Sequence, residues 1–297
     1  MTDPVSLAPV VAKRRAAAAL ALLLTAGACG SDISDVQDLG WPSDPDGPAT
    51  TTAGSDGRDV RRTPTAEHPL RVTSIGDSVA FDADPGIRAA LESTGRAVVV
   101  NRSYGGVGLL RPQFDGYLAE TMDGNPEVVV VMLGGWDLGE ALAEPAVYRR
   151  RVDQVLDVLV AEGVFVVWLG MPPTPPDEGL EEARVVINEL FEEAAAERPD
   201  IDYRSTDALL GGPDGRFRRV LPGLDSRPAQ VRKVREGHDD GHLCPAGAAL
   251  IGDLVYAAVG SRHPLPRRAA GWWRADWTGD ERYDDPPGGC STDGPVD

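Results

Sequence analysis

The sequence predicts an α/β protein built as a three-layer αβα sandwich, with a central parallel sheet of five strands. Short aliphatic runs alternate with longer segments in which apolar residues recur at helical spacing, which is the pattern of strands joined by helices. Residues 128–133 form a continuous, mostly β-branched run, as expected of a strand that helices cover on both faces. Hydrophobic residues make up 42% of the 297-residue chain, which is enough to bury a large core.

The individual elements follow in order along the chain. Five strands are expected, at residues 71–75, 97–101, 128–133, 164–169 and 201–203. The first helix should be capped by Asp84, with Pro85 at its first helical position. Helical spacing of apolar residues predicts further helices over 148–159 and 186–194, and a last helix that begins near Pro245.

Residues 1–28 indicate an exported protein, because they have the layout of a lipoprotein-type signal peptide. A basic group at 13–15 precedes an apolar stretch at 16–24, which is too short to span a bilayer. The small residues before Cys29 resemble a lipobox, in which this cysteine would carry the lipid. We therefore expect anchoring to the outer face of the cell membrane, or secretion if Cys29 is not lipidated.

The rest of the chain divides into three parts by composition. Residues 29–67 are rich in Ser, Asp, Thr, Pro and Gly and predict a disordered linker. Residues 68–262 carry the α/β pattern, and residues 263–297 form a Trp-rich tail. Cys244 and Cys290 remain as a pair, and two cysteines in an exported protein usually form a disulfide, which would tie the tail to the domain.

The net charge excludes one class of partner. The formal charge is −18 at pH 7, and a strongly acidic surface repels the phosphate backbone of nucleic acids. The same charge opposes electrostatic docking on anionic lipid. We expect a monomer that needs no metal or other cofactor.

Two segments carry residue types suited to acyl-group chemistry. In a parallel sheet, sites form at the carboxyl ends of the strands, and Ser78 directly follows the first predicted strand. A serine on such a turn can expose its hydroxyl, and its own backbone N–H can stabilise a developing oxyanion. Near the last helix, Asp239 can hold Nδ1 of His242 and leave Nε2 free to take the serine proton. Asp240 is the alternative acid, but the spacing favours Asp239.

With these segments, residues 70–259 resemble the SGNH (GDSL-type) hydrolase superfamily. Together with the signal peptide, they resemble an exported bacterial lipoprotein of that superfamily. Gly-Asp-Ser at 76–78 matches the nucleophile motif, although Val79 stands where Leu is usual, and Asp-x-x-His at 239–242 matches the last motif. The resemblance implies a flavodoxin-like fold and a triad of Ser78, His242 and Asp239. It also implies an oxyanion hole with N–H groups from Ser78 and from a glycine after the second strand, which we assign to Gly108, with Gly106 as the alternative.

The third family motif is altered. The expected Gly-x-Asn-Asp reads Gly-Gly-Trp-Asp at 134–137, so Trp136 replaces the asparagine donor of the oxyanion hole. Its indole N–H could donate in that place, or its ring could pack under the site. A tryptophan here is similar to SGNH domains associated with membrane acyltransferases that modify cell-envelope sugars.

These features predict an exported serine esterase or acyl-transfer enzyme acting on O-acyl groups, above all O-acetyl groups, of cell-envelope glycans. The alternative is a lipid-anchored, non-catalytic glycan-binding domain with a degraded oxyanion hole. A metal site among the acidic residues and histidines at 236–242 is not expected, because their spacing does not match a helical two-His motif. The tryptophans at 272, 273 and 277 either line the cleft and stack on sugar rings or attach the tail to the domain surface.

Overall fold

A computed structural model describes residues 62–290 of the chain. The predicted signal peptide at 1–28, the predicted lipidation site Cys29 and most of the linker at 29–67 lie outside the described residues. None of the helices within residues 62–290 is both long enough and apolar enough to cross a membrane.

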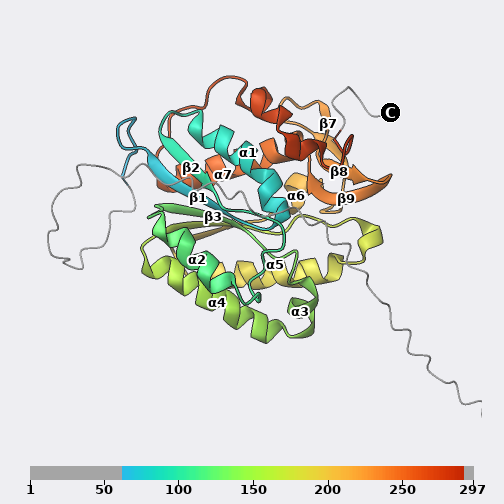
Figure 1. Cartoon of the computed structure of the whole chain (residues 1–297), viewed down its shortest axis with the longest axis horizontal. Helices are drawn as coiled ribbons and strands as arrows, with labels where there is room; N and C mark the ends of the chain where they lie inside the picture. Colours follow the sequence, from blue (N-terminus) through green and yellow to red (C-terminus); the bar gives the residue numbers. More distant parts are fainter. Residues whose placement is uncertain (1–61, 291–297) are drawn as a thin grey trace, which may run out of the picture. The chain divides into compact units, whose positions relative to one another are not determined.

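The centre of the fold is a parallel sheet of five strands, which confirms the predicted fold class (Figure 1). Its strands are β1 (Leu70–Gly76), β2 (Ala97–Asn101), β3 (Val128–Met132), β4 (Phe165–Leu169) and β5 (Ile201–Arg204). Their order across the sheet is β2-β1-β3-β4-β5, and every neighbouring pair is parallel. Strands β3 and β4 are buried at every position, as their continuous apolar sequences require.

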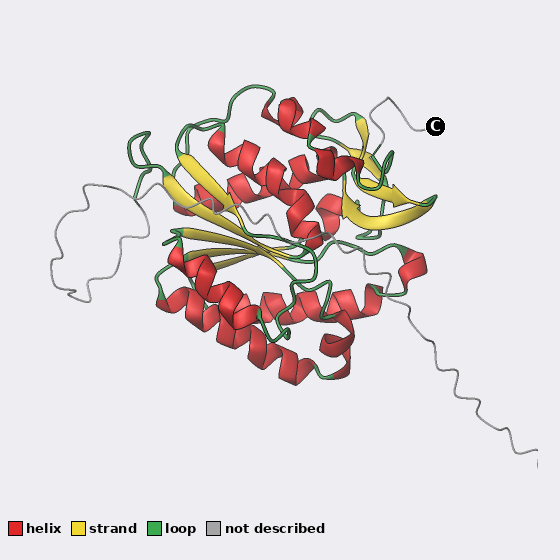
Figure 2. Cartoon of the chain, in the orientation of Figure 1, coloured by secondary structure: helices red, strands yellow, loops and turns green. Residues whose placement is uncertain are grey.

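Helices cover both faces of the sheet and complete the three layers (Figure 2). One face carries α1 (Ser78–Glu92) and α7 (Pro245–Arg262), and the other carries α2 (Phe114–Asp123), α4 (Pro145–Ala161) and α5 (Glu181–Ala196), with the short α3 (Leu138–Ala143) beside them. Two clusters of buried apolar side chains, one on each face, form the core.

Helix α1 begins earlier than its sequence predicts. Its N-cap is Asp77, whose side chain accepts the N–H of Val79, so Asp84 and Pro85 lie inside the helix. A proline inside a helix lacks an N–H and leaves the carbonyl four residues earlier without its helical partner. That carbonyl belongs to Phe81, and it accepts a hydrogen bond of 2.5 Å from the guanidinium of Arg282. A contact 201 residues away in sequence therefore compensates the proline.

Two short antiparallel hairpins lie between β5 and α7, where the sequence predicts no strand. They consist of β6 (Val220–Pro222) with β7 (Pro228–Gln230), and of β8 (Arg232–Arg235) with β9 (His238–Leu243). The single helical turn α6 (Asp207–Leu210) precedes them, and the 3₁₀ turn η1 (Pro176–Glu178) follows β4. The pairing of β8 with β9 is irregular between Arg232 and Val234.

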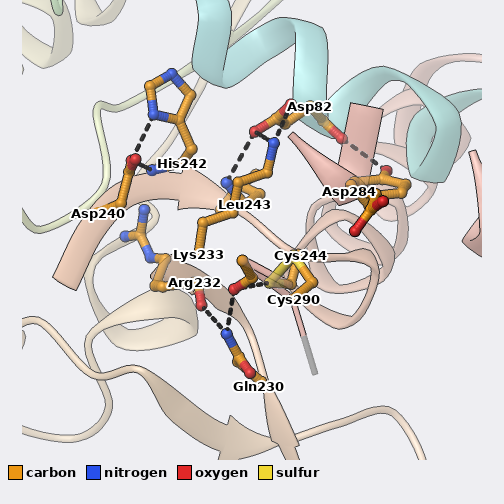
Figure 3. Close-up of a disulfide and its surroundings, with 12 residues drawn as sticks. Asp82, Gln230, Arg232, Lys233, Asp240, His242, Leu243, Cys244, Asp284 and Cys290 are labelled. Carbon is orange, nitrogen blue, oxygen red and sulfur yellow. Dashed lines mark hydrogen bonds and ion pairs between the residues drawn. A yellow bond between two sulfur atoms is a disulfide. The ribbon is translucent and has the colours of Figure 1, made fainter. Parts of the chain in front are cut away.

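The C-terminal tail folds back over α1 and α7. It contains the 3₁₀ turns η2 (Trp272–Arg274), η3 (Asp276–Gly279) and η4 (Glu281–Asp284). The predicted disulfide is present between Cys244 and Cys290 (Figure 3). Trp272 is buried against Ala90 of α1 and Ala249 of α7, so the tail is packed onto the domain by an apolar contact as well as by the disulfide.

Candidate active site

Ser78, His242 and Asp240 form a continuous hydrogen-bonded chain. The hydroxyl oxygen of Ser78 lies 2.8 Å from Nε2 of His242. On the other side of the ring, Nδ1 of His242 lies 2.5 Å from a carboxylate oxygen of Asp240 (Figure 3). This is the arrangement of a nucleophile, a base and an acid that orients the base. The structure thus brings the predicted Ser78 and His242 together.

The structure does not bring the predicted acid, Asp239, to His242. Asp240 lies against Nδ1 of His242 instead. The Asp240 carboxylate accepts the backbone N–H of His242 at 2.8 Å as well as Nδ1, so it binds the residue two positions later, as aspartates in Asx turns do. The second Asp240 oxygen pairs with Arg235 at 2.8 Å. Asp239 points elsewhere and pairs with Arg219 at 2.6 Å. The cause is the irregular strand β9, which the sequence spacing does not reveal.

The junction of β1 and α1 holds Ser78 in place. Gly76 has a φ of +155°, and a Cβ there would lie 2.1 Å from the carbonyl oxygen of Met132 on the neighbouring strand. Only glycine fits this turn. The next residue, Asp77, is buried and uses both carboxylate oxygens, one for Val79 N–H and one for Gly135 N–H, each at 3.0 Å. It therefore ties the turn that carries Ser78 to the loop after β3.

Charges around the triad shift the pKa values of its members. Burial lowers the pKa of His242, but the hydrogen bond and negative charge of Asp240 outweigh burial, so the pKa lies above its ordinary value of 6.5. Burial opposes ionisation of Asp240, yet the hydrogen bond to His242 and its charge lower the pKa of Asp240. Asp77 differs, because burial raises its pKa to about 6, although the hydrogen bonds from the backbone N–H groups of Val79 and Gly135 lower it. Asp240 is therefore the ionised partner of His242.

The loop after β2 is arranged differently from the expected oxyanion loop. Gly108, the predicted donor, faces Asp137, and a Cβ on Gly108 would lie 2.6 Å from that carboxylate. The N–H of Leu109 donates to the same carboxylate at 2.6 Å. The glycine beside Ser78 is Gly105, whose Cβ position lies 3.9 Å from Cβ of Ser78. Asp137 therefore holds the loop through the N–H of Leu109 and lies against Gly108, while Gly105 passes next to Ser78.

Trp136 is an exposed residue at the site. Its side chain is 49% accessible, and the guanidinium of Arg111 lies 5.6 Å from the centre of its ring. It lines the same cavity as Ser78 and His242. With about half of the residue exposed, its ring does not pack under the site as one of the alternatives expects.

A cavity of about 440 Å³ opens beside Ser78 and His242. One part of its wall is apolar and includes Leu138, Met171 and Pro173, and another part is polar and includes Glu178, His238 and Asp239. The tail tryptophans are not among the residues that line it, so of the two alternatives the one in which they line the cleft does not fit the structure. They attach the tail to α1 and α7 instead.

A fully buried arginine, Arg232, supports the turn that precedes His242. Arg232 donates to the carbonyl of Gly241 at 2.5 Å and to the carbonyl of Pro173 at 3.1 Å. It thereby joins the turn between Asp240 and His242 to the loop after β4. Sequence analysis did not identify Arg232, because its partners are backbone carbonyls that no motif marks. Within residues 62–290, no group of three or more His, Cys, Asp or Glu side chains is placed to hold a metal ion.

Solved structures of acyl-group enzymes resemble this chain only weakly. A GDSL-like lipase from Bacteroides thetaiotaomicron is 15% identical, with a TM-score of 0.46 over 68% of this chain and 94% of the lipase. The C-terminal catalytic domain of peptidoglycan O-acetyltransferase A from Streptococcus pneumoniae is 17% identical, with a TM-score of 0.41 over 68% of this chain and 98% of that domain. At these scores, neither likeness carries an argument about function.

No protein with a curated description matches the sequence significantly. One family model does match, over residues 71–258, which run from β1 to α7 and include all three residues of the hydrogen-bonded chain. Since this match covers more than half of the sequence, the chain belongs to the family DUF459, which is described as a protein of unknown function.

Proposed function

We propose that this protein is a serine hydrolase or acyl-transfer enzyme of the SGNH type, with Ser78 as nucleophile, His242 as base and Asp240 as the orienting acid. The observation that carries the proposal is the unbroken chain of hydrogen bonds from Ser78 through His242 to Asp240. A serine hydroxyl is a weak nucleophile by itself, and a base within 2.8 Å supplies the activation that it needs.

The reaction follows from this geometry. Ser78 Oγ attacks the ester carbonyl while His242 Nε2 takes the hydroxyl proton, and Asp240 stabilises the resulting imidazolium. The tetrahedral intermediate then expels the alcohol, which receives the proton from His242, and an acyl-enzyme remains on Ser78. A water molecule or a sugar hydroxyl loses its proton to His242 and attacks the acyl-enzyme, which frees Ser78 and returns the proton. Water gives hydrolysis, and a sugar hydroxyl gives acyl transfer.

The oxyanion would lie at the N-terminus of α1. The backbone N–H of Ser78 belongs to the first turn of this helix, where the helix dipole favours negative charge. The 105–106 segment supplies the second donor in this proposal, because Gly105 passes next to Ser78. Gly135, which precedes Trp136, already donates its N–H to Asp77. The indole of Trp136 is the third donor.

The substrate that we propose is an O-acyl group, foremost O-acetyl, on a glycan of the cell envelope. An exposed tryptophan at the mouth of a cavity suits the stacking of a sugar ring. The disulfide fits an oxidising compartment outside the cytoplasm, in agreement with the predicted signal peptide and lipid anchor at Cys29.

Covalent labelling tests the nucleophile directly. A fluorophosphonate should modify the wild type on Ser78, and the labelled peptide should be absent from Ser78→Ala and greatly reduced in His242→Ala. The variant Asp239→Asn is the matched control, because Asp239 lies beside the triad but pairs with Arg219. Labelling of Ser78→Ala at the same rate as the wild type would refute the assignment.

The acceptor is tested with the same protein. Hydrolysis of 4-nitrophenyl acetate is measured with and without a de-O-acetylated cell-envelope glycan. Faster release of nitrophenol together with an acetylated glycan product supports transfer, whereas release that the glycan does not change supports hydrolysis. A wild type that is inert to esters and phosphonates but binds glycans as well as Ser78→Ala would support the non-catalytic alternative, whose only basis is the altered motif at Trp136.

Two substitutions separate the proposed roles of Trp136. Trp136→Phe keeps an aromatic face and removes the N–H, so kcat should fall roughly 100-fold or more if the indole is an oxyanion donor. If the ring only stacks on a sugar, Trp136→Phe should keep kcat for a small acetyl ester, and Trp136→Ala should raise KM for the glycan alone.

A further inference from the structure

Lys233 is an unusual residue in this chain. The sequence contains only two lysines, Lys13 and Lys233, and its other basic side chains are arginines apart from four histidines. Lys233 is also buried, with 4% of its side chain accessible. A buried ammonium needs partners for its charge and for its three N–H groups.

The partners of Lys233 come from two other parts of the molecule. Its Nζ lies 3.1 Å from the carboxylate of Asp82 on α1, and this carboxylate is itself only 3% accessible. The same Nζ donates to the backbone carbonyl of Arg282 at 2.7 Å and to that of Asp285 at 3.0 Å, both in the tail. One nitrogen therefore joins α1, strand β8 and the tail. A planar guanidinium does not place three donors on a single atom, which explains a lysine here.

The carboxylate of Asp82 also reaches the strand that carries the base. It accepts the backbone N–H of Leu243 at 3.1 Å, as Figure 3 shows with the dashed lines from Asp82 to Leu243 and Lys233. Leu243 directly follows His242, and Asp82 lies four residues after Ser78, on the same face of α1. The hydrogen bond from Leu243 to Asp82 thus runs beside the one that joins His242 to Ser78.

We infer that Lys233 is a positioning residue for the nucleophile and the base. It fixes the Asp82 carboxylate between α1 and β9, and this carboxylate holds the backbone next to His242 at the distance that the Ser78 hydrogen bond needs. The inference rests on the proposed function of Ser78 and His242. It adds a residue that has no hydrogen bond to Ser78 or His242 and is not among the residues that line the cavity.

The inference predicts an effect on turnover rather than on substrate binding. Lys233→Met replaces the side chain at similar volume and removes the ammonium, so the Asp82 carboxylate keeps the N–H of Leu243 but loses the ion pair that holds it from the other side. We expect kcat for 4-nitrophenyl acetate to fall roughly tenfold or more with little change in KM, since small displacements of reacting groups cost rate. Lys233→Arg should also lower kcat, because a guanidinium does not place three donors on a single atom. Arg198→Met, which removes a cation paired with α4 on the other face of the sheet, should leave kcat unchanged.

Two double variants keep the inference testable if Lys233→Met does not fold. Lys233→Met with Asp82→Asn buries no charge and retains an oxygen for the N–H of Leu243, whereas Lys233→Met with Asp82→Leu retains none. Between two folded proteins, we expect the asparagine variant to keep the higher kcat and the slower hydrogen exchange at the Leu243 amide. Wild-type kcat in both folded double variants would overturn the inference.

Labelling by the fluorophosphonate separates this inference from the proposed function. If the wild type does not label at Ser78, the proposed function fails first. If the wild type labels and the folded leucine double variant labels equally fast, only the positioning role of Lys233 fails. A slower labelling rate in the leucine variant than in the asparagine variant supports it.

Discussion

Adjacent aspartates with different partners provide a sharp test at the scale of single residues. Asp240 binds Nδ1 of His242, and Asp239 binds Arg219. In Asp240→Asn, the amide no longer favours the tautomer that presents a free Nε2 to Ser78, so kcat should fall on the order of 10⁴-fold. Asp239→Asn loses only a partly exposed ion pair and should stay close to the wild type. Equal losses in the two variants, measured by ester hydrolysis, would contradict the assignment of the acid.

The pH dependence of the reaction follows from His242. The base accepts a proton only when its ring is neutral, and its pKa lies above 6.5 because the interaction with Asp240 outweighs burial. The plot of kcat/KM against pH should therefore rise to half of its maximum at a pH above 6.5. A midpoint below that value would show that Asp240 does not act on the base.

Asp84 gives a prediction about stability. It is buried inside α1, its Oδ1 has no hydrogen-bond partner within the described part of the chain, and burial raises its pKa from 3.8 to about 6. The folded state holds this proton more tightly than the unfolded state, so the free energy of unfolding falls as pH rises from 3.8 to about 6. The contribution is about 3 kcal/mol.

Asp84→Asn removes that titration. Between pH 4 and pH 7, the free energy of unfolding of the wild type should fall by about 2 kcal/mol more than that of the variant, because part of the contribution is already lost at pH 4. Denaturant unfolding at both pH values measures the difference. Parallel pH dependence of the two proteins would show that Asp84 does not titrate as described.

At the scale of elements, the junction between β1 and α1 has no room for a side chain at Gly76. A Cβ at Gly76 would lie 2.1 Å from the Met132 carbonyl and 2.3 Å from the Ala80 side chain. Gly76→Ala should therefore lower the free energy of unfolding by at least about 3 kcal/mol. Gly116→Ala is the matched control, because Gly116 lies within α2 with open space around it. That change should stabilise the protein by up to about 1 kcal/mol.

The elements also show which features a sequence of this kind can and cannot predict. The five strands of the sheet were predictable, because most of them are short apolar runs and helical segments lie between them. The start of α1 was not, because Pro85 is typical of a first helical turn, and the donor that compensates it, Arg282, is far away in sequence. Strand β9 reads His-Asp-Asp-Gly-His-Leu, which has no apolar alternation. Its irregular backbone selects Asp240 over Asp239, so only the structure could identify the acid.

At the scale of the whole molecule, the disulfide joins Cys244, the N-cap of α7, to Cys290 in the tail. It closes a segment of 46 residues that contains η2, η3 and η4. A crosslink over this separation stabilises the folded state by about 4 kcal/mol in the chain-entropy model. The double variant Cys244→Ser with Cys290→Ser should lose about this amount in denaturant unfolding. Reduction of the wild type should give the same loss, and an unchanged midpoint in both cases would show that the tail is held by its other contacts alone.

The scarcity of lysine has a practical consequence. Amine-directed reagents acylate a neutral amino group that solvent can reach, and between residues 62 and 290 the only lysine is Lys233. Since its ammonium is enclosed by α1 and the tail, it can react only when these separate. The rate at which a succinimidyl ester modifies Lys233, measured by mass spectrometry of the native protein, therefore reports how often the tail separates from α1. The measurement needs no engineered residue.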